Sequence, residues 1–152
     1  TLVAQPMAYA PRRQEIGSYV MGYSTPVFSP TGGMKISAPD LARYMIMHMK
    51  LGKAGGRRII KKKSAITMQT PLSEKEGYGL AIATTDKLVA GKTLKGHTGS
   101  AYGLYSAMYF DPNEKWGIVV ITNGCRPGYT EGYNTVIRKT VNVLFRYIIS
   151  EK

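Results

Sequence analysis

The stretch Lys95-Gly96-His97-Thr98-Gly99-Ser100 decides the fold prediction for this sequence, because it joins chemically capable side chains to a run of strands. Residues 92–99 are predicted to form one strand and residues 104–110 the next. A turn rich in Pro and Asx residues leads from them to a third, apolar strand at residues 116–122. A polar His-Thr-Gly sequence at the end of one strand, backed by two hydrophobic strands, predicts a site at the edge of a sheet.

Further strands and helices are predicted around this centre. Residues 77–84 are expected to pair with residues 92–98 in an antiparallel arrangement, so that four strands follow one another as a meander. Three helices are predicted. The first begins at the N-cap Ser37 and continues to about Gly52, and the second begins at the N-cap Ser64 and stops before Pro71. The third runs from about residue 130 to residue 149. Helices packed on an antiparallel sheet of about three to five strands predict an α+β fold.

The remaining features concern domain organisation. Residues 1–30 contain several prolines and glycines and are predicted to be an irregular arm, because proline fixes φ and removes a backbone donor. Residues 31–152 are predicted to form the domain. No apolar run reaches about 18 residues, so no transmembrane segment is expected. The lone Cys125 cannot form an internal disulfide.

The order of several short motifs resembles that of a known family. Thr31-Gly32-Gly33-Met34 precedes a helix, and the later motifs are Tyr78-Gly79-Leu80, Gly96-His97-Thr98-Gly99, Phe110-Asp111-Pro112 and Val119-Val120-Ile121-Thr122-Asn123-Gly124. This order resembles the C-terminal part of the serine β-lactamase and penicillin-binding protein superfamily, in the branch of class C β-lactamases, D-Ala-D-Ala peptidases and related esterases. The resemblance covers roughly residues 28–148 and implies the C-terminal portion of a β-lactamase/transpeptidase-like fold.

The resemblance implies roles for the four residues after Gly96. Thr98 would hydrogen-bond the carboxylate or acyl side of a substrate, and Gly99 would allow the substrate to approach the strand closely. The backbone N–H of Ser100 would be one of two oxyanion donors. His97 stands where the family usually has lysine, and an imidazole can donate, accept or shuttle a proton, which suits an esterase or a peptidase as well as a β-lactamase. The alternative is that His97 and Thr98 only end an edge strand.

The other motifs of this superfamily are absent from the printed sequence. No serine is followed three residues later by lysine, and no Y-x-N sequence precedes Gly32. We therefore expect a C-terminal fragment of a serine hydrolase, inactive alone, whose partners are a small-molecule or peptide substrate and a missing N-terminal segment. A relative that naturally lacks the nucleophile is the alternative. Self-association would cover apolar surface left by the missing segment. The family resemblance suggests a periplasmic or extracytoplasmic location, and it implies no metal or cofactor.

The charge balance is strongly basic, with 21 Lys+Arg, 9 Asp+Glu and a net charge of +12. Such an excess favours anionic partners. The densest run, residues 57–63, lacks interleaved aromatic residues and any docking motif, so nucleic acid is not the expected partner. A solvated basic surface is one interpretation, and a non-catalytic binding module for an anionic polymer is the alternative function.

Two groups of residues are interpreted as structural. His48 lies on the apolar stripe of the first predicted helix, so we interpret it as half-buried and hydrogen-bonded and not as catalytic. Tyr102 and Tyr105 flank the His-Thr-Gly stretch and have the size to wall a pocket. The chain has 11 tyrosines, however, so packing is the plainer interpretation for each.

Overall fold

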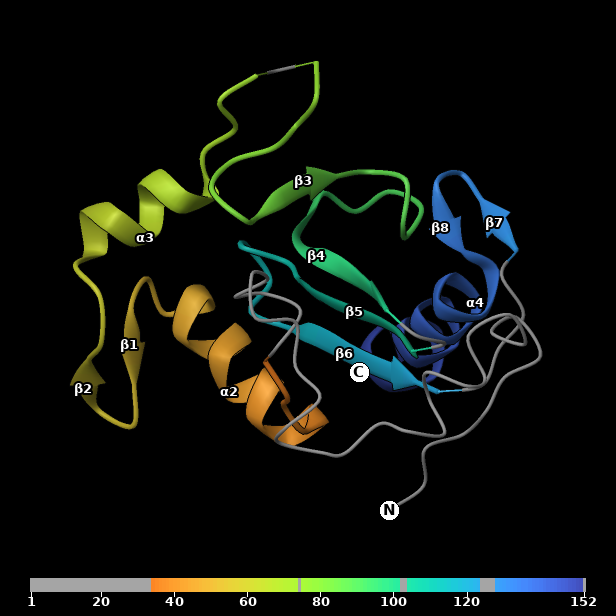
Figure 1. Cartoon of the computed structure of the whole chain (residues 1–152), viewed down its shortest axis with the longest axis horizontal. Helices are drawn as coiled ribbons and strands as arrows, with labels where there is room; N and C mark the ends of the chain where they lie inside the picture. The colour runs from red at the N-terminus through yellow and green to blue at the C-terminus, as the bar shows by residue number, and fades with distance from the viewer. Residues whose placement is uncertain (1–33, 74, 102–103, 124–127, 152) are drawn as a thin grey trace, which may run out of the picture.

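The computed structural model describes residues 34–73, 75–101, 104–123 and 128–151, and Figure 1 shows their arrangement. The predicted arm, residues 1–30, and Cys125 lie outside the described residues. The centre is an antiparallel sheet whose strands are ordered β3-β4-β5-β6, so the predicted meander is confirmed. Its strands are β3 (Ala83–Thr85), β4 (Leu94–Ala101), β5 (Leu104–Phe110) and β6 (Gly117–Thr122).

The strand predicted at residues 77–84 is only partly correct. Continuous pairing begins at Ala83, and Tyr78 makes only isolated bridges with Ser73 and with Ala83. Gly77 and Ala81 have φ values of 61° and 60°, which break the extended backbone that a strand requires. Residues 77–82 therefore form a bent loop in front of a short β3.

Helices cover both faces of the sheet, which confirms the α+β prediction (Figure 1). They are α2 (Ala38–Met49) on one face, and α4 (Thr135–Leu144) with its continuation η2 (Phe145–Ile149) on the other. Successive side chains of a strand point to opposite faces, and β5 divides accordingly. Tyr105, Ala107 and Tyr109 join the core beneath α4, whereas Met108 and Phe110 join the core beneath α2.

The helix α2 begins as the sequence predicts. The Ser37 side chain accepts a hydrogen bond of 3.2 Å from the backbone N–H of Asp40. The helix ends at Met49 and not at Gly52, because Leu51 and Gly52 adopt positive φ values of 48° and 94°. Met45 and Met47 are buried, which anchors α2 to the sheet region.

A small hairpin and a short helix extend from α2 (Figure 1). The hairpin strands are β1 (Lys53–Ala54) and β2 (Arg57–Arg58), joined by Gly55-Gly56, where both glycines have positive φ as a tight two-residue hairpin turn requires. The helix is α3 (Lys62–Gln69), and its N-cap is Lys61, without a side-chain hydrogen bond. The predicted cap at Ser64 is therefore wrong, because the N-cap lies three residues earlier, nearly one turn of helix.

The last helix begins later than predicted. Residues 129–134 form a second hairpin with strands β7 (Tyr129–Thr130) and β8 (Tyr133–Asn134), because Glu131 and Gly132 take positive φ values. Asn134 then caps α4 by accepting hydrogen bonds from the backbone N–H groups of Val136 and Ile137. The predicted end at Ile149 is confirmed. Within the described residues, no helix combines the length and the apolar character that crossing a membrane requires.

Candidate active site

The His-Thr-Gly box, Gly96-His97-Thr98-Gly99, lies where β4 leaves its neighbour β3. Pairing between β3 and β4 covers only Leu94 to Gly96, whereas β5 pairs with β4 as far as Ala101. Residues 97–101 consequently have no strand partner on the β3 side among the described residues. The box is thus carried on a sheet edge, as the sequence predicts.

The side chains of the box divide between the two faces of the sheet. Directly opposed residues of antiparallel strands share a face, and His97 opposes Met108, on the α2 face. Thr98 opposes Ala107, on the α4 face, and Ser100 follows it on the same face by alternation. The structure therefore does not bring the side chains of His97, Thr98 and Ser100 together on one face. The three residues have in common that their backbone lies on the edge of β4 that faces away from β5.

The two glycines of the box differ in what a side chain would meet: backbone at Gly96 and a movable side chain at Gly99. A Cβ on Gly96 would lie 1.9 Å from the carbonyl oxygen of Met108 and 2.7 Å from the Cα of Tyr109, which belong to the backbone of β5. A Cβ on Gly99 would lie 2.5 Å from Oγ of Ser106. Glycine at position 96 therefore permits the close pairing of β4 with β5, whereas for Gly99 the resemblance implies the approach of a substrate.

Tyr78 contacts His97, and sequence reasoning missed it. The Tyr78 hydroxyl lies 3.0 Å from Nε2 of His97, and the two rings meet edge to face with centroids 5.6 Å apart. Nδ1 of the same ring contacts the carbonyl oxygen of Thr98. Both His97 and Tyr78 are exposed. The available signal was a tyrosine placed between two glycines, Gly77 and Gly79, just before the predicted strand.

A buried polar connection lies behind the box. Lys95, which alternation places on the same face as His97, donates from Nζ to the carbonyl oxygen of Gln69 at 2.7 Å. Burial lowers the pKa of this lysine. The buried Gln69 side chain in turn donates to the carbonyl oxygen of His48 at 2.9 Å. This connection fixes α2 and α3 relative to the strand that carries the box.

His48 differs from its sequence interpretation. The ring is fully buried, not half-buried, and neither ring nitrogen has a hydrogen-bond partner among the described residues. It contacts the Tyr44 ring edge to face at a centroid distance of 4.7 Å. Burial lowers the pKa of His48, so the ring is kept neutral. Its position inside the α2 side of the core agrees with a structural role.

The packing interpretation can be checked for one of the two tyrosines that flank the box. Tyr105 is buried in the core beneath α4, so the packing interpretation is correct for it. Tyr102 lies outside the described residues. Tyr109, another core tyrosine, has its pKa raised by burial and then by the neighbouring Tyr133, which keeps the Tyr109 proton in place.

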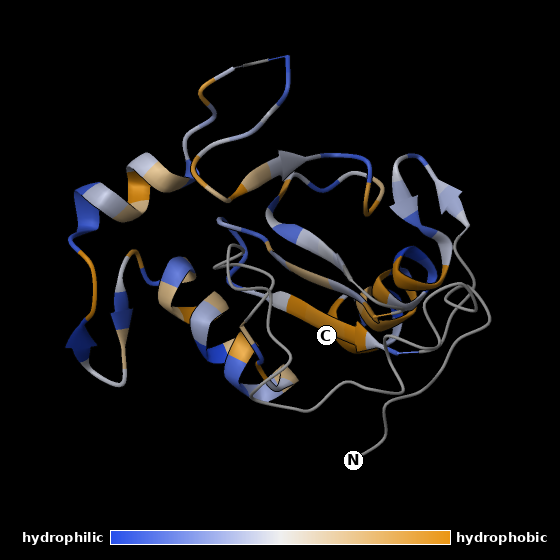
Figure 2. Cartoon of the chain, in the orientation of Figure 1, coloured by the Kyte–Doolittle hydropathy of each residue, from blue (hydrophilic) through white to orange (hydrophobic). Residues whose placement is uncertain are grey.

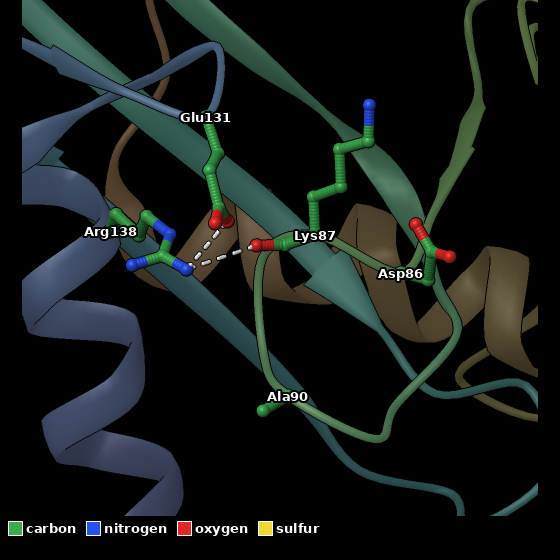
Figure 3. A pocket seen from close by; sticks show the side chains of 5 residues that line it. All are labelled: Asp86, Lys87, Ala90, Glu131 and Arg138. Carbon is green, nitrogen blue, oxygen red and sulfur yellow. Dashed lines mark hydrogen bonds and ion pairs between the residues drawn. The ribbon is translucent and has the colours of Figure 1, made fainter.

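A surface hollow of about 490 Å³ lies elsewhere, between the loop after β3 and the start of α4 (Figure 3). Its lining residues are Asp86, Lys87, Ala90, Glu131 and Arg138. The Arg138 guanidinium bridges the carboxylate of Glu131, at 2.7 Å, and the carbonyl oxygen of Lys87, at 3.4 Å, as Figure 3 shows. None of the box residues lines this hollow, and two of its charged side chains, Arg138 and Glu131, form an ion pair with each other.

One of three comparisons with known proteins returns a match. A search of curated proteins and a search of solved structures each return no match. The family model described as beta-lactamase matches residues 2–142, nearly the whole chain, including α2, the His-Thr-Gly box and most of α4. The resemblance to the serine β-lactamase and penicillin-binding protein superfamily is thereby confirmed. The chain belongs to the beta-lactamase family.

Proposed function

We propose that this chain supplies the His-Thr-Gly side of the active site of a serine hydrolase that cleaves amide or ester bonds. Family membership supports hydrolysis of the serine β-lactamase type in general. The observation that carries the finer proposal is the edge of β4 to which no described strand is paired, where His97, Thr98 and the backbone N–H of Ser100 follow one another. A sheet edge offers main-chain donors to a developing oxyanion, and a histidine beside it offers a proton.

Each residue of the edge has a proposed role. The Thr98 hydroxyl binds the substrate carboxylate or acyl side, and the Ser100 N–H donates to the oxyanion. Gly99 leaves room for the substrate along the strand. His97 is the acid-base group. Because Thr98 and His97 lie on opposite faces of the sheet, the substrate would lie along the edge and meet one residue on each side.

The nucleophile must come from outside this sequence. We propose that a serine, with a lysine three residues later, lies in an N-terminal segment, because no such pair occurs in the chain. Residues 31–152 would then be the C-terminal part of the catalytic domain. A penicillin, a peptide and an ester each fit this chemistry, and the labelling experiment below uses probes for two of these classes.

Intact-mass labelling tests the proposal. The 152-residue chain and a longer product that includes upstream coding sequence are treated with a fluorescent penicillin and with a fluorophosphonate. We expect an adduct only on the longer product, because acylation requires the serine. An adduct on the 152-residue chain, or no adduct on either, would contradict the proposal.

A matched pair of variants sharpens this experiment. In the longer product, Thr98→Val removes a proposed hydrogen bond to a charged substrate group and should slow labelling by about 10- to 100-fold. Thr93→Val makes the same chemical change at an exposed threonine just before β4 and should leave the rate unchanged. Equal labelling rates for both variants would show that Thr98 does not bind the substrate.

A second candidate function is a binding module for an anionic polymer, and a specific observation favours it. No Asp or Glu occurs between residues 41 and 73. The exposed basic residues between positions 50 and 63 of this segment are hereafter called the basic face: Lys50, Lys53, Arg57, Arg58, Lys61, Lys62 and Lys63. None of them forms an ion pair among the described residues. Figure 2 shows the hydrophilic character of β1, β2 and the start of α3.

A further inference from the structure

We infer that Tyr78 is a proton-transfer residue of the His-Thr-Gly site, with His97 acting on the substrate through the Tyr78 hydroxyl. This inference rests on the proposed function for the direction in which the proton moves. The series of hydrogen-bonded groups on which the inference depends is present in the structure independently of that function. It consists of the Thr98 carbonyl, the His97 ring and the Tyr78 hydroxyl.

The tautomer of His97 follows from its partners. A carbonyl oxygen can only accept a hydrogen bond, so Nδ1 of His97, which contacts the Thr98 carbonyl, carries the proton of the neutral ring. Nε2 is then the acceptor, and the Tyr78 hydroxyl, 3.0 Å away, is the donor. Both nitrogens of the neutral imidazole are therefore engaged. The group that remains able to accept a proton from a ligand is the phenolic oxygen.

The backbone around Tyr78 holds its side chain in this position. Gly77 has a φ of 61°, and a Cβ there would lie 2.7 Å from the carbonyl oxygen of Thr84. A Cβ on Gly79 would lie 2.4 Å from the carbonyl oxygen of Met68, at the end of α3. The two glycines thus let the loop press against β3 on one side and α3 on the other.

Backbone hydrogen bonds close this loop around Tyr78. Its carbonyl oxygen accepts from the N–H of Leu72 at 2.8 Å, and the N–H of Gly79 donates to Ile82 at 2.8 Å. The N–H of Thr84 donates to the carbonyl oxygen of Gly77 at 2.6 Å. The loop is fixed on both sides although the Tyr78 side chain is 39% exposed. A rigid backbone that presents an exposed phenol to a histidine is an arrangement suited to proton transfer.

The proposed step is a balanced proton transfer. The O–H bond of Tyr78 breaks as the proton moves to Nε2 of His97, which leaves a phenolate beside an imidazolium. The Nδ1–H of the imidazolium continues to donate its hydrogen bond to the Thr98 carbonyl oxygen. The phenolate then accepts the proton of a hydroxyl nucleophile, serine or water, and the proton on Nε2 returns through Tyr78 to the alcohol or amine leaving group.

Nitrogen NMR of the histidine rings tests the inference without substrate. The chain has only two histidines, and His48 is buried in the core, so the two rings are readily distinguished. In the ¹⁵N-labelled 152-residue chain above pH 7.5, long-range ¹H–¹⁵N spectra should show His97 as the Nδ1–H tautomer. In Tyr78→Phe, the Nε2 signal of His97 should move toward the position of an unbonded acceptor.

The control is Tyr129→Phe, which removes the hydroxyl of another exposed tyrosine, on β7, and should leave both nitrogen signals of His97 unchanged. An Nε2–H tautomer in the wild-type chain, or an Nε2 signal indifferent to Tyr78→Phe, would overturn the inference. Labelling of the wild-type 152-residue chain and of the wild-type longer product bears on the hydrolase proposal alone, so a failure of that proposal can be told apart from a failure of this inference. In a longer product that labels, Tyr78→Phe should slow acylation about 100-fold, and labelling at the wild-type rate would also overturn it.

Discussion

At the scale of single residues, the spacing between β4 and β5 depends on Gly96. Any side chain at this position meets main-chain atoms of the partner strand, and those atoms cannot move aside without breaking the ladder. The His-Thr-Gly box is therefore held in place by a residue that takes no part in the proposed chemistry. His97, Thr98 and Gly99 follow directly along the strand, so their positions depend on this close approach.

Gly96→Ala should lower the free energy of unfolding by about 1–3 kcal/mol, since this is the typical cost of overpacking and the atoms that the new methyl group meets belong to the backbone of β5. Gly128→Ala is the matched control, because a Cβ there would meet the Thr135 hydroxyl at an ordinary 3.5 Å. Urea denaturation followed by circular dichroism measures both. If the two variants were equally stable, the close pairing of β4 with β5 would be contradicted.

At the scale of the element, α2 carries a neutral histidine inside the core. Burial lowers the pKa of His48 in the folded chain. In the unfolded chain the ring returns to its ordinary pKa, near ~6.5. The unfolded state therefore takes up a proton first as the pH falls, and the free energy of unfolding should decrease from about pH 7.5 to about pH 5.5. A tenfold difference in proton affinity corresponds to about 1.4 kcal/mol.

The midpoints of urea denaturation at about pH 7.5 and about pH 5.5 test the role of His48. His48→Phe should remove most of the pH dependence, because the substituted ring cannot bind a proton. His97→Gln serves as the control and should retain the dependence, since His97 is exposed and lies outside the core. A wild-type chain whose stability is flat over this range would show that His48 is not desolvated in solution.

At the scale of the whole molecule, positive charge is gathered on one part of the surface. The basic face spans the end of α2, both strands of the β1–β2 hairpin and the start of α3, while the box lies on β4. Charge without acidic partners attracts polyanions through long-range fields that salt screens. Binding to an anionic polymer and hydrolysis at the β4 edge would therefore use different surfaces.

Retention on a heparin column, as a model polyanion, tests this surface. Replacing Lys61, Lys62 and Lys63 together by Gln should lower the salt concentration needed for elution. The control replaces the exposed Lys75, Lys115 and Lys139 by Gln, which removes equal charge elsewhere. Equal shifts for the two triple variants would show that total charge, not the basic face, governs binding.

The sequence predicted the three long strands, the α2 cap and the edge position of the box, because alternation and capping are local signals. It did not predict the late start of α4, since apolar spacing continues backward through the β7–β8 hairpin and hides the Asn134 cap. The contact between Tyr78 and His97 joins residues 19 positions apart through a bent loop. Such a contact depends on positive φ values at Gly77 and Ala81, which no periodicity shows.

The start of α3 has a consequence for how the molecule responds to its solvent. Lys61, Lys62 and Lys63 stand at the positive end of the helix dipole, with no acidic residue in the first turn and no side-chain cap. The helix is therefore opposed by its own charges, and its amide hydrogens should exchange faster than those of α4. Added salt, which weakens most surface ion pairs, should slow exchange in α3 by screening this repulsion. A bound polyanion would neutralise the same charges, so amide exchange in α3 should also slow when such a polymer binds.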